Sequence, residues 1–378
     1  MNPTIQHYPS IQHFGSVQEL LSEFKRFDDY RKFQHEDNSG YKPPKDKFEK
    51  IRLKDNSFIL VPTDAQFTLY RGQNTFYENC RPTIYRTELN ELALFINQLK
   101  LNELFLLLNE YPVIKHIFKQ EKFKVDYLGL AQHYGLMTDV LDFTSDINIA
   151  LFFATCFYDS SLDKYMPLMT DEIQTGYLYV YPFYKALRSE NSFELFLCDK
   201  LQVIGLQPFF RPAAQKGFSL KLQKNESLNT LCYTFNYNKR DSQFFYEKYN
   251  QGNSLWLKDI LAEKVKMINN SLRFSFDAFH LSIKAIGTKL KKGSYYHSLL
   301  KTNSVKLCQR EELPWMFSEE EIKNIAEQWD SKDADLFWNS IVTRRMIIDN
   351  VEYSEFSIKE FSLYFTLRLF LGEDNKLI

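Results

Sequence analysis

The chain has 378 residues, which is enough for two domains of ordinary size and too many for a disulfide-stapled miniprotein. Hydrophobic residues make up 44% and charged residues 25%, and these globular values exclude a chain that is disordered throughout. The formal net charge of -1 leaves no global field that would attract nucleic acid or an anionic membrane.

The N-terminal part of the chain predicts one short helix followed by a loop. The segment Ser16–Glu19 has the pattern of a capping box and predicts a helix that runs to about Arg26. Residues 34–47 are polar and contain two successive prolines, which predicts a loop. We assign residues 1–54 to an N-terminal lead made of this helix and loop.

Short strands dominate the prediction for residues 55–240. Their expected ranges are 58–61, 67–70, 140–143, 177–181, 201–204, 218–222 and 231–235. Between the strands, Glu88 to Leu108 has apolar residues at three- and four-residue spacing, which predicts an amphipathic helix. We expect a second helix to begin at Asp126 and to end at Gly135. A third helix, Ile147 to Phe157, is apolar almost all round and should be buried.

Residues 241–378 predict a helical C-terminal region, with capping-box patterns at Ser318–Glu321 and Ser357–Glu360. Residues 278–310 contain seven basic and no acidic residues, whereas residues 311–378 contain 15 acidic and 7 basic residues. No aromatic recognition motif accompanies the basic block, and an acidic segment follows it directly. We therefore favour a solvated, partly neutralised face over a nucleic-acid surface.

Together these elements predict an α+β fold. A domain with a short-stranded mixed sheet is flanked by an N-terminal helix and a helical C-terminal region.

The start of the chain lacks a signal-peptide pattern, and the longest apolar run, Phe361 to Gly372, is too short to span a membrane. The five cysteines form no Cys-x-x-Cys pair and the histidines no HExxH pair. We expect a cytoplasmic protein with no metal and no membrane attachment.

Three sequence blocks carry a family resemblance. The first is Tyr70-Arg71-Gly72-Gln73, followed by RPTIYR at residues 81–86. The second is AQHYGLMTDVLDFT at residues 131–144, followed by NIALFFA at 148–154, and the third is RPAAQKGF at 211–218. These blocks resemble the FRG domain family, named for its Phe/Tyr-Arg-Gly motif, which has roughly QHYGLPTRLLDWT followed by ALYFA. The resemblance covers roughly residues 55–225, and we assign residues 55–240 to an FRG-like domain.

Three residues of the second block depart from the family pattern. Met137 stands where the family usually has proline, and Phe143 replaces tryptophan. Asp139 stands where the family usually has arginine, which reverses a charge beside the expected site. If the family arginine contacts a ligand phosphate, that contact is not expected here.

The first two blocks contain residue types suited to an anionic ligand. An arginine next to Gly72 at the end of a strand presents a planar cation beside unobstructed backbone, so Arg71 suits a phosphate or carboxylate. An ordinary turn arginine has the same local pattern and remains the alternative. Thr144 and Ser145 precede Asp146, which can cap the next helix, and hydroxyls at a helix N-terminus lie where an anion is favoured.

The second block also supplies groups that can position a ligand. Gln132, His133 and Tyr134 can share one pocket because the helix ends directly after them, although a lone helical histidine is often structural. Asp142 alternates with apolar neighbours on a short strand, and a buried carboxylate needs a partner. Arg71 is the partner we expect, either in a ligand site or in a structural ion pair.

The order of these elements also looks like the Arg and Ser-Thr-Ser elements of ADP-ribosyltransferases. The resemblance implies that Arg71 holds an NAD phosphate or ribose and that the hydroxyl pair supports a nicotinamide pocket. The glutamate that such enzymes carry on a later strand is replaced by Gln215, which cannot act as a general base but can hydrogen-bond ribose. Glu172 and Glu194 lie in the same region without a motif.

Two functions follow as hypotheses. The first is a nucleotide-binding enzyme that uses NAD as a substrate, by ADP-ribosyl transfer or glycohydrolysis, with a toxin or phage-defence role. The expected catalytic residues are Arg71, His133, Asp142 and Gln215. The expected ligand-binding residues are Tyr70, Arg71, Gly72, Gln132, His133, Tyr134, Thr144 and Ser145. The second hypothesis is a non-catalytic module that senses a nucleotide or another small molecule, or that binds a protein partner, and neither hypothesis includes nucleic acid.

Overall fold

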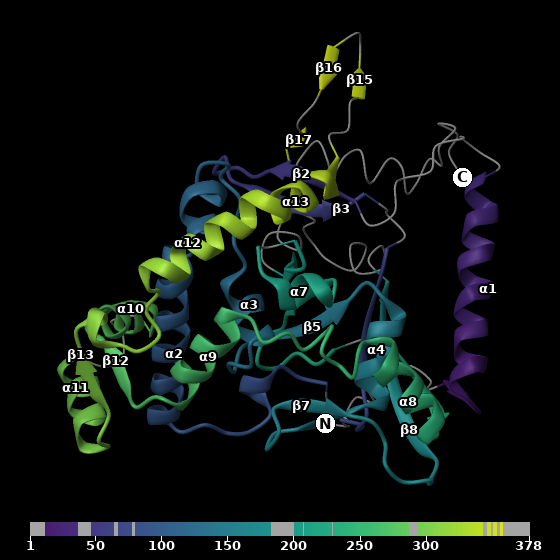
Figure 1. Ribbon diagram of the computed structural model, residues 1–378, viewed down its shortest axis with the longest axis horizontal. Helices are drawn as coiled ribbons and strands as arrows, with labels where there is room; N and C mark the ends of the chain where they lie inside the picture. The colour runs from purple at the N-terminus through teal and green to yellow at the C-terminus, as the bar shows by residue number, and fades with distance from the viewer. Residues whose placement is uncertain are drawn as a thin grey trace, which may run out of the picture.

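The structure of the protein is a computed structural model. It describes residues 12–36, 47–63, 67–77, 80–182, 200–206, 208–228, 230–286, 293–342, 346–348, 351–353 and 356–357. Helices surround a seven-stranded sheet and smaller sheets, which confirms the predicted α+β class (Figure 1).

The seven-stranded sheet brings together strands that are distant in the sequence. Its strands follow the order β1 (Gln12–Phe14), β11 (Leu231–Tyr237), β8 (Gln174–Pro182), β4 (Thr68–Gln73), β5 (Val140–Thr144), β10 (Gly217–Lys221) and β9 (Leu201–Val203). The pair β1–β11 is parallel, and the other neighbouring pairs are antiparallel. The strands that carry the first two sequence blocks, β4 and β5, are therefore neighbours.

The strands β4 and β5 are paired at one register position. Tyr70 lies opposite Thr144, whereas β4 pairs with β8 along its whole length, from Thr68 to Gln73. The two strands therefore diverge beyond this pair. We call residues 70–73 and 140–144 the β4–β5 junction.

Two helices cover one face of the sheet, α3 (Tyr127–His133) on β5 and α4 (Ile147–Thr155) on β4. The helix α4 is buried, as its apolar composition predicts. It lies so close to β4 that a Cβ atom added at Gly72 would meet the Ala150 carbonyl oxygen at 1.7 Å. The glycine of the Arg-Gly pair is therefore required by packing.

The rest of the sheet is covered by neighbouring elements on both faces. On the α4 side lie α1 (Val17–Glu36) and α8 (Lys239–Lys248), which contact β11 and α4 respectively. The opposite face packs against a small antiparallel pair, β2 (Phe48–Arg52) and β3 (Phe58–Pro62). Both faces of the main sheet are thus inside the protein, which explains why its strands are apolar on both sides.

The C-terminal helices pack around α2 (Glu91–Glu110), away from α1 (Figure 1). They are α9 (Ile260–Asn270), α10 (Phe276–Ile286), α11 (Gly293–Thr302), α12 (Glu319–Gln328) and α13 (Ala334–Ser340). One apolar cluster joins α2 and α3 to α9, α12 and α13. The C-terminal helices therefore share a core with α3, the helix that supports the second sequence block. The predicted domain boundary at residue 240 stays a prediction.

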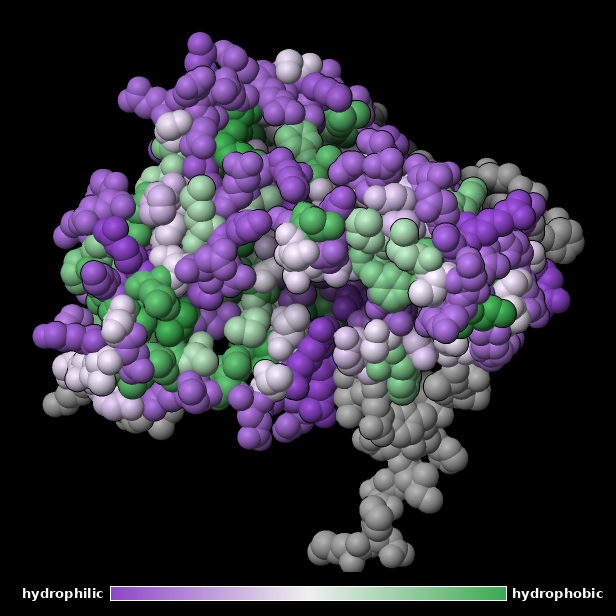
Figure 2. Space-filling model, turned by 60° about the horizontal axis from the view of Figure 1, so that its bottom comes forward, coloured by the Kyte–Doolittle hydropathy of each residue, from purple (hydrophilic) through white to green (hydrophobic). Residues whose placement is uncertain are grey.

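Short elements complete the described chain. They are the helix α7 (Phe210–Ala214) and the strands β6 (Phe157–Asp159), β7 (Lys164–Met166), β12 (Arg273–Ser275), β13 (Lys306–Cys308), β14 (Ile341–Val342), β15 (Met346–Ile348), β16 (Val351–Tyr353) and β17 (Phe356–Ser357). The face in Figure 2 shows hydrophobic residues in separate groups between hydrophilic ones.

Several predicted boundaries were wrong for local reasons. The helix predicted from Glu88 begins at Glu91, because the Asn90 side chain accepts the Ala93 N–H and caps the helix there. The first helix does not end at about residue 26 but continues into the predicted loop, as far as residue 36. The apolar helix α4 ends at residue 155, since Cys156 is extended and the next residue begins β6. The helix α8 and the strands β1, β2, β6 and β7 were not predicted.

Some predicted features lie outside the described residues. These are Cys198, Glu194, Lys289, Lys291, Lys292, the run Phe361–Gly372 and most of the Ser357–Glu360 box. Within the described part of the chain, no helix has both the length and the apolar character needed to span a membrane. The capping box at Ser318 is confirmed.

Candidate functional site

The first two sequence blocks meet at the β4–β5 junction. Arg71 on β4 donates a hydrogen bond from Nη1 to the backbone carbonyl oxygen of Asp142 on β5, at 2.9 Å. We expected its partner to be the Asp142 carboxylate, and the structure places the guanidinium on the carbonyl of the same residue instead. The Nε of Arg71 is buried and has no hydrogen-bond partner within the described residues. One donor of the arginine therefore remains unpaired between the strands.

The helix α3 brings His133 to the same junction. Asp126 accepts the Gly129 N–H at 3.0 Å and caps the start of α3, and Gly135, with φ of +91°, follows its end, as predicted. His133 is 6% exposed, and its Nδ1 lies 3.7 Å from Asp142 Oδ1. Among the described residues, no hydrogen-bond partner exists for either ring nitrogen or for Asp142 Oδ1.

Gln132 orients this carboxylate. Its Oε1 accepts hydrogen bonds from the hydroxyls of Thr83 at 3.1 Å and Thr138 at 2.7 Å. Because these two contacts hold the carbonyl end of the amide, its Nε2 is directed at Asp142 Oδ2, 3.5 Å away. Gln132 thus links the segment after the first block to the second block.

The two predicted tyrosines make structural contacts. The Tyr134 hydroxyl donates to Asp259 Oδ2 at 2.6 Å, and burial together with that carboxylate raises the pKa of Tyr134 well above its ordinary value. Tyr70 is 8% exposed and packs edge-on against Phe24 of α1, with ring centroids 6.0 Å apart. Tyr134 is therefore tied to the N-cap of α9, and Tyr70 packs against α1.

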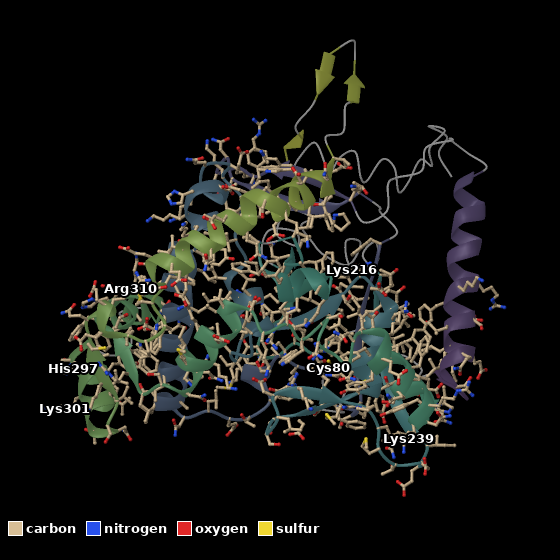
Figure 3. The ribbon with its side chains drawn as sticks, viewed as in Figure 1. Cys80, Lys216, Lys239, His297, Lys301 and Arg310 are labelled. Atoms are coloured by element: carbon tan, nitrogen blue, oxygen red, sulfur yellow. The ribbon has the colours of Figure 1, made fainter. Side chains whose placement is uncertain are left out.

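Thr144 and Ser145 lie at the start of α4. The Thr144 hydroxyl accepts the Asp146 N–H at 3.1 Å, and Asp146 accepts the Asn148 N–H at 3.0 Å, which confirms the predicted helix cap. Lys216, labelled in Figure 3, forms an ion pair with Asp146 at 3.2 Å. Burial opposes ionisation of Asp146, but the ion pair with Lys216 and the hydrogen bonds from Asn148 together outweigh burial and lower the pKa of Asp146. The cap is thus an ionised carboxylate with its own cation.

The third block holds a separate segment of chain in place. Arg211 donates from Nε and Nη2 to the Leu257 carbonyl oxygen, at 3.0 and 2.9 Å. Gln215 donates from Nε2 to the Leu255 carbonyl oxygen at 2.8 Å. The guanidinium of Arg211 also stacks over Trp256, 4.1 Å from the ring centroid. Gln215, the predicted catalytic residue of this block, and Arg211 therefore both position residues 255–257.

Sequence reasoning missed the aromatic cluster that this segment completes. We use the name aromatic cluster for Tyr158, Tyr165 and Trp256. The ring centroid of Trp256 lies 5.3 Å from each tyrosine ring, and its Nε1 lies 3.4 Å from Asp163 Oδ1. Asp163 also accepts hydrogen bonds from Tyr158 at 2.7 Å and from Lys266 at 3.0 Å. The cation–π contact with Arg211 depends on the three-dimensional fold, so the sequence indicated such a cluster only through its high content of aromatic residues, 16%.

A second arginine contributes positive charge near the junction. Arg86 donates from Nε to the Arg81 carbonyl oxygen at 3.0 Å. Although Arg86 has an exposed surface, desolvation by the surrounding protein and the nearby Arg71 cation lower its pKa, while Asp142 acts in the opposite direction. The junction thus combines two cations, one carboxylate and one imidazole. The described residues contain no group of three or more metal-ligating side chains.

The three residues that depart from the family pattern contact neighbouring parts of the protein. Asp139 pairs with Lys221 of β10 at 3.5 Å, so the reversed charge is balanced within the sheet. Since Asp139 precedes Asp142 by three residues, it lies about 10 Å away along an extended chain. The Met137 carbonyl accepts a hydrogen bond from Asn97 of α2, and Phe143 is buried in the core below the sheet.

Comparison with known protein families adds one assignment. The model of the FRG domain matches residues 66–162, which include the first two blocks and end before the third. Searches of the curated proteins and of the solved structures give no match. The similarity to ADP-ribosyltransferases gains no support from these comparisons and stays a prediction. Residues 66–162, which contain both strands of the β4–β5 junction, are thus the part of the chain that matches the FRG domain.

Proposed function

We propose that the β4–β5 junction binds a nucleotide, with NAD as the candidate ligand. The supporting observation is a group of buried polar atoms that have no hydrogen-bond partner among the described residues: Arg71 Nε, both ring nitrogens of His133, and Asp142 Oδ1. Leaving one such atom unpaired costs about 1–3 kcal/mol. Several of them together are retained most readily where a ligand supplies the missing partners.

The chemistry of these atoms favours a ligand with both phosphate and ribose. The Arg71 guanidinium can donate to a phosphate oxygen, and Arg86 adds a second cation nearby. A neutral His133 ring offers one donor and one acceptor, and Asp142 Oδ1 can accept from a ribose hydroxyl. An isolated phosphate would use the donors and leave the carboxylate without a partner.

Isothermal titration with NAD tests binding. We expect Arg71→Lys to weaken NAD affinity at least about tenfold, because lysine keeps the charge and loses the Nε–H and the planar fork. The control is Lys301→Ala on α11, an exposed residue at the left edge of the molecule in Figure 3, away from Lys216. The proposal fails if wild type does not bind NAD or if Arg71→Lys binds it equally well.

Cleavage of NAD is a second candidate function, and the contact between Asp142 and His133 favours it. In this reaction the bond from ribose C1′ to the nicotinamide nitrogen breaks, and its electron pair leaves with nicotinamide. A bond then forms from C1′ to the oxygen of water, or to an acceptor group, which loses a proton. The Asp142 carboxylate can stabilise the positive charge that develops on the ribose, and His133 can accept the proton. A toxin or phage-defence role depends on this second function.

Nicotinamide release, followed by chromatography, separates the two candidates. We expect wild type to release nicotinamide from NAD and Asp142→Asn to do so about 100-fold more slowly while still binding NAD. Binding without release would instead support a non-catalytic, ligand-sensing module. The melting temperature of each variant shows whether the fold is retained.

A further inference from the structure

We propose that the aromatic cluster binds the planar base of the ligand and that Trp256 selects base-bearing nucleotides over sugar phosphates. This inference rests on the proposed function, which places the phosphate and ribose at the β4–β5 junction. It adds to the proposed site a second part, which would bind the base. Tyr158 of this part lies at the edge of the FRG match, Tyr165 lies just after the match, and Trp256 lies well beyond it.

Arg211 connects the cluster to the junction. Its guanidinium lies 4.1 Å from the Trp256 ring centroid and 5.2 Å from that of Tyr134. Tyr134 follows His133 directly at the end of α3. One buried arginine therefore touches both the indole of the cluster and the residue next to the unpaired imidazole.

Electrostatic interactions give a second link between the aromatic cluster and the β4–β5 junction. Burial raises the pKa of Tyr165, and the negative charge of Asp142 acts in the same direction. The positive charge of Arg71 opposes this shift. The charges of Asp142 and Arg71 therefore act on the hydroxyl of Tyr165, in addition to the contacts that Arg211 makes with Trp256 and Tyr134.

The cluster has the accessibility that a stacking surface requires. Tyr158 is 45% exposed, and Trp256 is partly exposed, whereas Trp315 and Trp329 are 1% and 5% exposed. Asp163 fixes the geometry by hydrogen bonds to both Tyr158 and Trp256. A base can stack on the exposed part of these rings without a rearrangement of the backbone.

The class of ligand follows from combining the β4–β5 junction with the aromatic cluster. An anion with a ribose fits the junction, and a neutral planar ring fits an aromatic surface. A nucleotide has both parts, and a sugar phosphate has only the first. Since stacking of a base on aromatic side chains typically changes affinity by about tenfold or more, the cluster can discriminate between them.

A matched pair of ligands tests this inference: adenosine 5′-monophosphate and ribose 5-phosphate, which differ by the base alone. We expect the wild-type chain to bind the nucleotide about tenfold or more tightly than the sugar phosphate. We expect Trp256→Ala to abolish that difference by weakening nucleotide binding alone. Trp338→Ala, which removes a 39% exposed tryptophan on α13, should leave the difference unchanged.

A second variant tests the inference even if Trp256→Ala does not fold. Tyr158→Ala changes an exposed ring and should narrow the difference between the two ligands by about threefold or more. The inference is overturned if wild type binds both ligands equally, or if the folded Trp256→Ala and Tyr158→Ala variants keep the wild-type ratio. If NAD, the nucleotide and the sugar phosphate all fail to bind, the proposed function fails as well.

Discussion

Two regions of the molecule bury ionisable side chains, and they treat them differently. In the helical region, Glu103 of α2 is 1% exposed and accepts hydrogen bonds from the backbone N–H of Ser275 and from Trp315 Nε1. Lys264 of α9 is 5% exposed and donates to the Met316 carbonyl oxygen and to Glu321. At the β4–β5 junction, by contrast, several buried polar atoms have no hydrogen-bond partner in the part of the chain that the structure describes.

Under the proposed function, this difference separates structural polar groups from groups that would bind a ligand. The pairs around Glu103 and Lys264 offset the cost of burying a charge, and they tie helices together. Arg310, in the same region, leaves two nitrogens without hydrogen-bond partners, but its Nη1 forms an ion pair with Glu110 at 2.6 Å. At the junction, unpaired donors and acceptors converge from three elements, β4, α3 and β5. Convergence, rather than an isolated unpaired atom, is what indicates a binding site.

The largest expected effect concerns the helical region. Glu103→Ala should lower the free energy of unfolding by about 3 kcal/mol, because the Ser275 N–H and the Trp315 indole lose their acceptor in a buried place. Urea unfolding measures this loss. Glu103→Gln keeps one acceptor oxygen and should cost less. Equal stability of wild type and Glu103→Ala would show that buried pairing does not distinguish the two regions.

Arg211→Ala should have the next largest effect, about 2 kcal/mol, from the loss of two hydrogen bonds to Leu257 and of the stacking on Trp256. We also expect weaker binding of adenosine 5′-monophosphate, since Trp256 is no longer held in place. Thermal unfolding and titration of the same sample report both quantities. Loss of stability with unchanged nucleotide binding would make Arg211 purely structural.

Asp163 predicts a smaller, pH-dependent effect. Burial opposes its ionisation, but hydrogen bonds from Tyr158 and Lys266 prevail and lower the pKa of Asp163 from 3.8 to about 2. The ionised form is therefore favoured by folding, so its contribution is fully present above about pH 4 and is lost as the pH falls toward 2. Because the carboxylate is partly exposed, we expect about 1 kcal/mol. Asp163→Asn should remove this part of the acid destabilisation, and an unchanged acid profile would contradict the assignment.

Much of the junction is predictable from local sequence. The caps at Asp126 and Asp146 and the end of α3 at Gly135 depend on neighbours a few residues away, and the structure confirms them. The meeting of the first two blocks followed from a family pattern. The contact of Arg71 with a carbonyl rather than a carboxylate was not predictable, because it depends on the divergence of β4 from β5.

The aromatic cluster could not be predicted, because long-range contacts build it. Trp256 is placed by hydrogen bonds from Arg211 and Gln215, which lie about 40 residues earlier in the chain. A contact of this kind produces no periodic pattern in the local sequence. The helix α8 was missed for a different reason: its capping box consists of Asn238 and Asp241 and not of the usual Ser/Thr and Glu/Gln pair.

The most direct test of the comparison is His133→Leu, with unfolding free energy and NAD affinity measured on the same preparation. A buried residue that serves structure should destabilise the protein when replaced, as we expect for Glu103. Neither ring nitrogen of His133 has a hydrogen-bond partner among the described residues, and its 3.7 Å contact with Asp142 is longer than a hydrogen bond, so a leucine of similar size should change stability by less than about 1 kcal/mol. We predict near-normal stability with NAD binding weakened about tenfold or more. A strongly destabilised variant, or a stable variant with wild-type NAD affinity, would contradict the assignment of this junction as a ligand site.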